Sequence, residues 1–172
     1  MIRTRLYPLS LTIAVIVLDQ VTKALVVARV DPYNIISEHA GGLLRIIHVR
    51  NPVVAFSLGS GLPEPWRSVL VIVLPSIVVA GVLWYYWTGA DLTNAHRWML
   101  AGVLGGGIGN LIDRFIRSQG VVDFIDVEFF GIFGLARWPT FNVADAAVVI
   151  SGLLFIMSVI RYEYMQKRKH ET

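Results

Sequence analysis

The stretch SVLVIVLPSIVVAGVLWYYWTGA, residues 68–90, decides the class of this fold. It contains 23 residues and no charged side chain. About 20 predominantly apolar residues in a helix cross the hydrocarbon core of a bilayer. The stretch therefore predicts a transmembrane helix, which we place at residues 68–89.

Three further apolar runs accompany this one. Residues 6–18, 98–112 and 146–160 carry no charge, and with their flanking polar residues they predict spans at 7–27, 97–115 and 142–161. The chain of 172 residues is 55% hydrophobic and 16% charged, against roughly 45–50% and about 25% in soluble domains. We therefore expect an all-α membrane protein with four transmembrane helices, in one domain covering residues 1–172.

Lysine and arginine indicate the orientation of these spans. A four-span topology places seven of them on each side, but Arg3, Arg5 and the cluster at 167–169 lie close to span ends, where positive charge favours the cytoplasmic side most strongly. We predict that both termini are cytoplasmic and that segments 28–67 and 116–141 lie outside the cytoplasm. Alternating residues around 43–49 predict a small extracytoplasmic β-sheet. The aromatic second segment is typical of an interfacial loop or helix.

This threading brings four acidic residues to one membrane boundary. Asp19 and Asp113 lie near the outer ends of the first and third spans, and Asp145 lies at the outer start of the fourth. Asp123 lies in the segment between the last two spans. Charged groups near hydrocarbon are costly and persist mostly where they are paired or functional. The sequence predicts a polar site at the extracytoplasmic interface.

Polar residues near these acids are spaced so that they share helix faces. Asp19 and Lys23 are four residues apart, and Asn142 and Asp145 are three apart. On the third span, Asn110 is followed by Asp113 and Arg114 at the same spacings. An intrahelical ion pair without function explains Asp19 and Lys23 equally well. Residues 102–109 contain two overlapping G-x-x-x-G patterns, which are typical of close helix packing.

The types of residue in the chain exclude several kinds of catalytic chemistry. The chain has no cysteine, and its histidines, at positions 39, 48, 96 and 170, form no H-E-x-x-H motif. No G-x-S-x-G motif supports a serine nucleophile. We expect neither a metal nor another cofactor, and the hydropathy argues against nucleic acid as a partner. Two carboxylates held close together share a proton, so that one acts as an acid while the other activates water. An aspartyl hydrolase needs only that pair and a water.

Five motifs in this chain resemble those of signal peptidase II, the bacterial lipoprotein signal peptidase. They occur in the order of that family and cover nearly the whole chain. They are Asp19-Gln-Val-Thr-Lys23, Asn51-Pro-Val-Val-Ala-Phe-Ser57, Gly106-Gly-Ile-Gly-Asn-Leu-Ile-Asp-Arg114, Val121-Val-Asp-Phe-Ile-Asp126 and Phe141-Asn-Val-Ala-Asp145.

The resemblance implies a four-helix aspartyl peptidase of the bacterial inner membrane. Such an enzyme removes the signal peptide from a prolipoprotein just before its diacylglyceryl-modified cysteine. By motif, Asp123 and Asp145 correspond to the catalytic pair. The resemblance implies that the remaining site residues contact substrate or support the pair: Asn51, Asn110, Arg114, Asn142, Asp19, Lys23 and Asp113. Asp126, in the same motif as Asp123, is expected to be a solvated or structural acid.

One position departs from the family pattern. The family usually has Asn-x-Gly-x-Ala-Phe, and Val53 stands in place of the glycine. The implied partners are the lipidated prolipoprotein and membrane lipid, and we expect a monomer. The alternative function is an ion- or proton-coupled membrane transporter, whose acids should be spread through the bilayer depth. An intramembrane protease of the presenilin type expects Gly-x-Gly-Asp, where this chain has Asn110.

Overall fold

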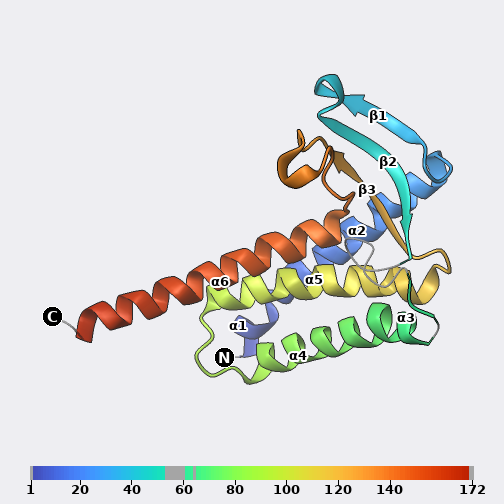
Figure 1. The fold of residues 1–172 in the computed structure, drawn as a ribbon. Coiled ribbons are helices and arrows are strands. Elements are labelled where there is room, and N and C mark those ends of the chain that lie inside the picture. Colours follow the sequence, from blue (N-terminus) through green and yellow to red (C-terminus); the bar gives the residue numbers. More distant parts are fainter. Residues whose placement is uncertain (1, 53–60, 64, 171–172) are drawn as a thin grey trace.

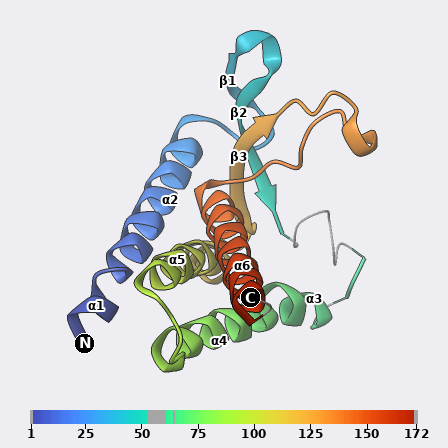
Figure 2. The ribbon, with the colours of Figure 1, turned by 90° about the vertical axis from the view of Figure 1, so that its left-hand side faces the viewer.

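The computed structural model describes residues 2–52, 61–63 and 65–170. Its helices form a bundle, and a small sheet projects from one end of it (Figures 1 and 2). In chain order the helices are α1 (Ile2–Leu6), α2 (Leu9–Arg29), α3 (Trp66–Ser68), α4 (Leu74–Thr88), α5 (Asn94–Ile116) and α6 (Val143–His170). A π-helical segment, Val69–Val73, joins α3 to α4.

Helix α5 is the centre of the bundle, packing along α2, α4 and α6. Its glycines allow this close packing, as the G-x-x-x-G patterns predict. A Cβ atom on Gly106 would lie 2.2 Å from the backbone oxygen of Ala144 in α6. On a neighbouring face, a Cβ atom on Gly105 would lie 3.1 Å from the backbone oxygen of Thr12 in α2. The glycines therefore bring α2 and α6 to backbone distance from α5.

The sheet contains three antiparallel strands in the order β1 (Ile35–His39), β2 (Leu44–Asn51) and β3 (Val121–Val127). Strand β2 confirms the sheet predicted around residues 43–49. Strand β3 lies in the segment for which we expected an interfacial loop or helix. Four consecutive residues of β3, from Val121 to Phe124, are buried. Burial on both faces removes the alternation that marks a half-exposed strand, so the sequence pattern did not indicate this strand.

The structure contains two buried apolar clusters, one where the sheet meets the helices and one within the bundle. One contains Val26 of α2 with Val122 and Phe124 of β3. The other lies toward the opposite end of the bundle, around Leu100, Leu104 and Tyr86. The outward faces of α2, α4 and α6 expose large apolar side chains, including Ile13, Ile77 and Leu153. Such surfaces suit contact with lipid tails.

Candidate active site

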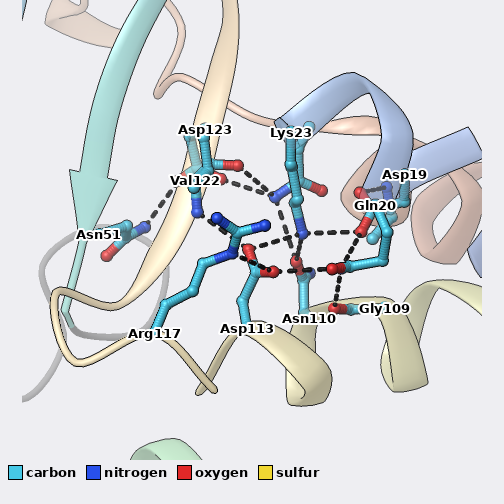
Figure 3. A network of polar contacts seen from close by, with 12 residues as sticks. Asp19, Gln20, Lys23, Asn51, Gly109, Asn110, Asp113, Arg117, Val122 and Asp123 are labelled. Carbon is cyan, nitrogen blue, oxygen red and sulfur yellow. Dashed lines mark hydrogen bonds and ion pairs between the residues drawn. The ribbon is translucent and has the colours of Figure 1, made fainter. Parts of the chain in front are cut away.

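The polar residues predicted at one membrane boundary lie together in the structure. They come from five elements that meet at the sheet end of the bundle (Figure 3). Helix α2 supplies Asp19 and Lys23, α5 supplies Asn110, Asp113 and Arg114, and α6 supplies Asp145. Asn142 directly precedes the first residue of α6. The strands supply Asn51, at the end of β2, and Asp123, in β3. Asp19, Lys23, Asp113, Asp123 and Asn142 are almost wholly buried.

Lys23 is the centre of a buried ion network. Its Nζ lies 2.8 Å from Oδ2 of Asp19 and 3.1 Å from Oδ2 of Asp113, and the side chains of all three residues are 0% exposed. Gln20 Nε2 donates to Asp19 Oδ2 and Asp113 Oδ1, each at 3.1 Å. A buried ammonium is stable only with such partners. We call Asp19, Gln20, Lys23 and Asp113 the buried ion network.

A pair of amides connects this network to two further carboxylates. Asn110 Oδ1 accepts from Lys23 Nζ at 2.9 Å and from Asn142 Nδ2 at 3.1 Å. Because its oxygen is occupied on that side, Asn110 directs its Nδ2 to Oδ1 of Asp145, 2.7 Å away. Asn142 Nδ2 also donates to Oδ1 of Asp123 at 2.7 Å. Asp123 and Asp145 therefore belong to one hydrogen-bonded set.

The start of α6 fixes Asp145 locally. The backbone N–H of Asp145 donates to Oδ1 of Asn142 at 2.9 Å, and the backbone N–H of Asn142 donates to Oδ2 of Asp145 at 3.2 Å. This reciprocal arrangement is a capping box, with asparagine as the N-cap and aspartate three residues later. The spacing of Asn142 and Asp145 in the sequence thus has a direct structural cause.

Asp123 lies in a different environment, on a strand outside the membrane-spanning helices. Its Oδ2 accepts from Asn51 Nδ2 at 3.0 Å, and its side chain is enclosed between β2 and α6. Burial and, after it, the charge of Asp145 raise the pKa of Asp123 from 3.8 to about 7, against the opposing hydrogen bonds from Asn51 and Asn142. A carboxyl with this pKa can carry a proton near neutral pH.

Arg114 and Asp126 have contrasting surroundings. Arg114 is half-buried and interacts electrostatically with Asp145 and Asp123, yet it forms no hydrogen bond or ion pair within the described part of the chain. Asp126 is buried and accepts from Arg137 Nε at 2.6 Å. Arg137 also donates to the backbone oxygen of Gly42 at 3.0 Å. Asp126 thus joins the loop after β3 to the sheet and lies outside the hydrogen-bonded set.

Two residues of the site received no role from the sequence. Gln20 follows Asp19 directly, and Arg117 donates from its Nε to Oδ1 of Asp113 at 3.0 Å. The four-residue spacing of Arg117 from Asp113 is a signal that could have indicated this pair. Val53 and the rest of its motif, through Ser57, lie outside the described residues. Across residues 2–52, 61–63 and 65–170, no group of three or more acids and histidines is placed to hold a metal ion.

Four helices of the described chain are long and apolar enough to cross a membrane. They cover Arg3–Arg29, Trp66–Thr88, Asn94–Ile116 and Val143–Arg168. A cavity of about 290 Å³ lies between α4, α5 and α6, lined by apolar residues that include Val103, Gly107 and Val148. Gly107 lies three residues before Asn110, and Val148 lies three residues after Asp145. The cavity is therefore one helical turn from the polar site.

Comparisons with known proteins agree with this architecture. The model of the signal peptidase (SPase) II family matches residues 11–161. The chain is 48% identical to a lipoprotein signal peptidase of Treponema denticola over 165 residues, which cover 96% of this chain and 95% of that one. It is 43% identical to a lipoprotein signal peptidase of Borrelia duttonii over 156 residues, covering 90% and 91% of the two chains.

Solved structures share the fold. A bacterial membrane enzyme determined by the in meso method at 2.3 Å resolution superposes with a TM-score of 0.75 at 24% identity, covering 90% of this chain and 88% of that chain. The family match and the curated relatives set the transporter alternative aside in favour of an enzyme. From the family match and the curated relatives, we conclude that this chain belongs to the signal peptidase (SPase) II family of aspartic endopeptidases of the bacterial membrane.

Proposed function

We propose that this enzyme cleaves the signal peptide from diacylglyceryl-modified prolipoproteins just before the lipidated cysteine, using Asp123, Asp145 and one water. The observation that carries this proposal is the hydrogen-bonded set in which Asn110 and Asn142 connect the two carboxylates. No other pair of acids in the described chain is both linked in this way and free of a basic ion-pair partner.

The two aspartates differ in surroundings, which supports a division of labour. Asp123, with its pKa near 7, carries the shared proton at the start of the reaction. Asp145 lies at the N-terminus of α6 and accepts a hydrogen bond from Asn110, both of which favour negative charge. Asp145 is then the general base, although the two carboxyls titrate as a coupled pair.

The reaction conserves protons through this pair. Asp145 takes a proton from water as the water oxygen attacks the carbonyl carbon preceding the lipidated cysteine, and Asp123 gives its proton to the carbonyl oxygen. In the second step the C–N bond breaks. The leaving amine receives the proton from Asp145, while Asp123 recovers a proton from the tetrahedral diol. The products are a free carboxyl on the signal peptide and a free amine on the cysteine.

Neighbouring groups support binding of a lipidated peptide. The apolar cavity one helical turn from the dyad suits an acyl chain or an apolar signal-peptide side chain. Arg114, which has no ion-pair partner in the described chain, is available for a peptide carbonyl. Asn51 reaches Asp123 from β2 and can orient the same peptide. The buried ion network supports the site through Lys23, Asp19 and Asp113.

We extend the proposal to the arrangement in the membrane. The chain is one integral domain with spans at about 7–27, 68–89, 97–115 and 142–161, both termini cytoplasmic, and the dyad at the extracytoplasmic interface. The basic residues Arg3 and Arg5 and the cluster at 167–169 support this orientation. We propose a monomer, surrounded by membrane lipid, as the active form.

The decisive experiment is a cleavage assay of purified enzyme with a diacylglyceryl-modified prolipoprotein. Asp123→Asn and Asp145→Asn keep side-chain size but remove the carboxyl chemistry, so each should abolish cleavage. Asp126→Asn is the matched control, because Asp126 pairs with Arg137 away from the dyad, and it should retain activity. Activity in the Asp123 or Asp145 variants, with Asp126→Asn inactive at normal protein levels, would overturn the proposal.

A further inference from the structure

We propose that Asp19 and Asp113 are positioning residues that fix the separation of the two dyad aspartates through the backbone. Each of them accepts a hydrogen bond from the amide of the residue that immediately precedes a dyad aspartate. This inference rests on the proposed catalytic pair of Asp123 and Asp145. It assigns to the buried ion network a function beyond the stability of the bundle.

The first contact joins α5 to β3. Oδ2 of Asp113 accepts from the backbone N–H of Val122 at 3.1 Å, and Val122 directly precedes Asp123. Both Asp113 and Val122 are 0% exposed. A carboxylate bond to a backbone amide is charge-assisted and shielded from water here, so it is strong and directional. Asp113 thereby sets the distance between β3 and α5 at Val122, the residue next to Asp123.

The second contact joins α2 to α6. Oδ1 of Asp19 accepts from the backbone N–H of Ala144 at 3.0 Å, and Ala144 directly precedes Asp145. Ala144 lies in the first turn of α6, whose amides have no partner within the helix. Asp19 is 0% exposed, as is Ala144. Asp19 thus holds the start of α6, and with it the backbone of Asp145.

Two side chains join these contacts into one unit. Lys23 Nζ binds Oδ2 of Asp19 at 2.8 Å and Oδ2 of Asp113 at 3.1 Å. Gln20 Nε2 bridges the same two carboxylates and also donates to the backbone oxygen of Gly109 at 3.0 Å (Figure 3). Because both acids are fixed to one ammonium and one amide, the backbone amides of Val122 and Ala144 are fixed relative to each other.

The symmetry of these contacts distinguishes positioning from general stabilisation. An ion network that only held α2 against α5 would need Lys23 and the two carboxylates. Here each carboxylate also accepts from one backbone amide, and each of those amides belongs to the residue before a dyad aspartate. Two such coincidences on separate elements, β3 and α6, point to control of the dyad geometry.

Lengthening each positioning side chain by one methylene tests this inference. Asp19→Glu and Asp113→Glu keep the charge opposite Lys23 but displace the acceptor oxygen by more than 1 Å. A misplacement of about 1 Å in a catalytic group costs about 100-fold in rate. We expect kcat of each variant to fall by about that factor, with KM for lipidated substrate within about twofold of wild type. Gln20→Leu removes the bridge and the bond to the Gly109 oxygen but leaves both carboxylates and Lys23 in place, so it should lower kcat by less than either glutamate variant.

The pH profile gives a readout that lost stability would not change. Two coupled carboxyls titrate in two steps, and the separation between those steps increases as the carboxyls approach. The charges of Lys23 from α2 and Arg114 from α5 are retained in both glutamate variants. We therefore expect the two apparent pKa values in the kcat profile to move closer together in Asp19→Glu and Asp113→Glu.

Thr12→Val is the matched control for packing. Thr12 Oγ1 donates to the backbone oxygen of Ala101 at 2.8 Å, so it is a buried polar contact between the same helices, α2 and α5. It lies seven residues before Asp19, about 10 Å along the helix. Thr12→Val should lower thermal stability without a change in the pH profile of the folded enzyme.

The outcomes separate this inference from the proposed function. If both glutamate variants behave like Thr12→Val, with kcat per folded enzyme and the pH profile unchanged, the positioning function is wrong even though the dyad stands. If one glutamate variant fails to fold, the other and Gln20→Leu still test it. If Asp123→Asn and Asp145→Asn remain active, the proposed dyad itself fails, whatever the glutamate variants do.

Discussion

At the scale of single residues, the identity of the partner decides what each carboxylate can do. Asp19, Asp113 and Asp126 each pair with a basic side chain. Asp123 and Asp145 bind amides instead. An amide donor orients a carboxylate without holding it ionised as strongly as a cation does. In the proposed function, this difference leaves Asp123 and Asp145 as the pair that exchanges protons.

The raised pKa of Asp123 predicts a pH-dependent stability. Its pKa is about 7 when folded, against 3.8 for the exposed carboxyl. The folded state therefore binds this proton more tightly than the unfolded state, so stability is lost as pH rises from about 4 to about 7, on the order of 4 kcal/mol in all. Asp123→Asn replaces the titrating carboxyl by a neutral amide, so the variant does not lose stability in this way. Its melting temperature should exceed that of wild type by a margin that grows from about pH 4 to about pH 7 and is constant above that range.

Thermal unfolding of both proteins in the same detergent, at a series of pH values, measures that margin. Asp126→Asn provides the comparison, since it removes an acid of the same strand outside the dyad. A margin for Asp123→Asn that does not change with pH would contradict the assignment of a buried, protonated Asp123.

The dyad also predicts non-additive losses of activity. If one carboxyl accepts a proton that the other must supply, either single replacement removes nearly all catalysis. The double variant Asp123→Asn/Asp145→Asn should therefore be no more than a fewfold slower than the slower single variant in the prolipoprotein assay. Losses that multiply would mean that the two acids act independently.

At the scale of elements, α5 is the helix on which the site depends. It contacts α2, α4 and α6, and its polar residues Asn110 and Asp113 meet Lys23 within α2, while Asn110 also meets Asn142 before the start of α6. Small residues allow these approaches, because α6 lies so near that a methyl group on Gly106 would meet the backbone of Ala144. The same approach brings Asn110 within reach of Asp145.

Adding that methyl group is a direct test of the packing. In Gly106→Ala the new Cβ would lie 2.2 Å from the oxygen of Ala144, so α6 must move. Overpacking of this kind costs about 1–3 kcal/mol, and the shift should also lower cleavage because Ala144 precedes Asp145. Gly152→Ala on α6 is the control, since a Cβ atom there has nothing within 4 Å.

Thermal unfolding and cleavage rates of the two variants make the comparison. The control should match wild type or be slightly more stable. Equal melting temperatures for Gly106→Ala and wild type would show that α5 and α6 are not held as closely as the structure has them.

At the scale of the whole molecule, the bundle and the sheet place Asp123 and Asp145 at one end of the chain's apolar surface. The sheet and α6 meet at this end, and the C-terminal part of α6 extends beyond the other helices at the opposite end (Figure 1). The C-terminal part of α6 carries Arg161, Lys167 and Arg168. Positive charge beside a span end favours the cytoplasmic side.

Reporter fusions test this orientation. Fusions at Gln166 and near Thr93 should report a cytoplasmic location, and a fusion at Gly41, in the turn between β1 and β2, should report an extracytoplasmic one. The opposite pattern would place the dyad in the cytoplasm and contradict the proposed access of exported substrates.

A dyad at the interface also predicts dependence on the lipid of the substrate. Acyl chains contribute about 0.8 kcal/mol per buried methylene to membrane anchoring, so two chains hold the cleavage site at the depth of Asp123 and Asp145. A precursor without the diacylglyceryl group should be cleaved much more slowly at equal concentration. Equal turnover of the two precursors in the same vesicles would rule out this requirement.

The sequence by itself determined the class of the fold and the neighbourhood of the site. Apolar length is a local property, so residues 68–90 and their shorter counterparts indicated the helices without any knowledge of packing. Because helices that cross a membrane must alternate in direction, the ends that bear Asp19, Asp113 and Asp145 followed from the order of the spans. The three-residue spacing of Asn142 and Asp145 is local too, and it became a capping box.

Only the tertiary structure decided which partner each acid has. Asp126 and Asp123 lie three residues apart in one strand, yet one meets Arg137 and the other meets Asn142. The orientation of Asn110 depends on Lys23, 87 residues away. Strand β3 is buried on both faces, so its pattern did not reveal it, and the bonds from Val122 to Asp113 and from Ala144 to Asp19 join separate elements. Such contacts arise from the close approach of distant segments, which local sequence patterns do not encode.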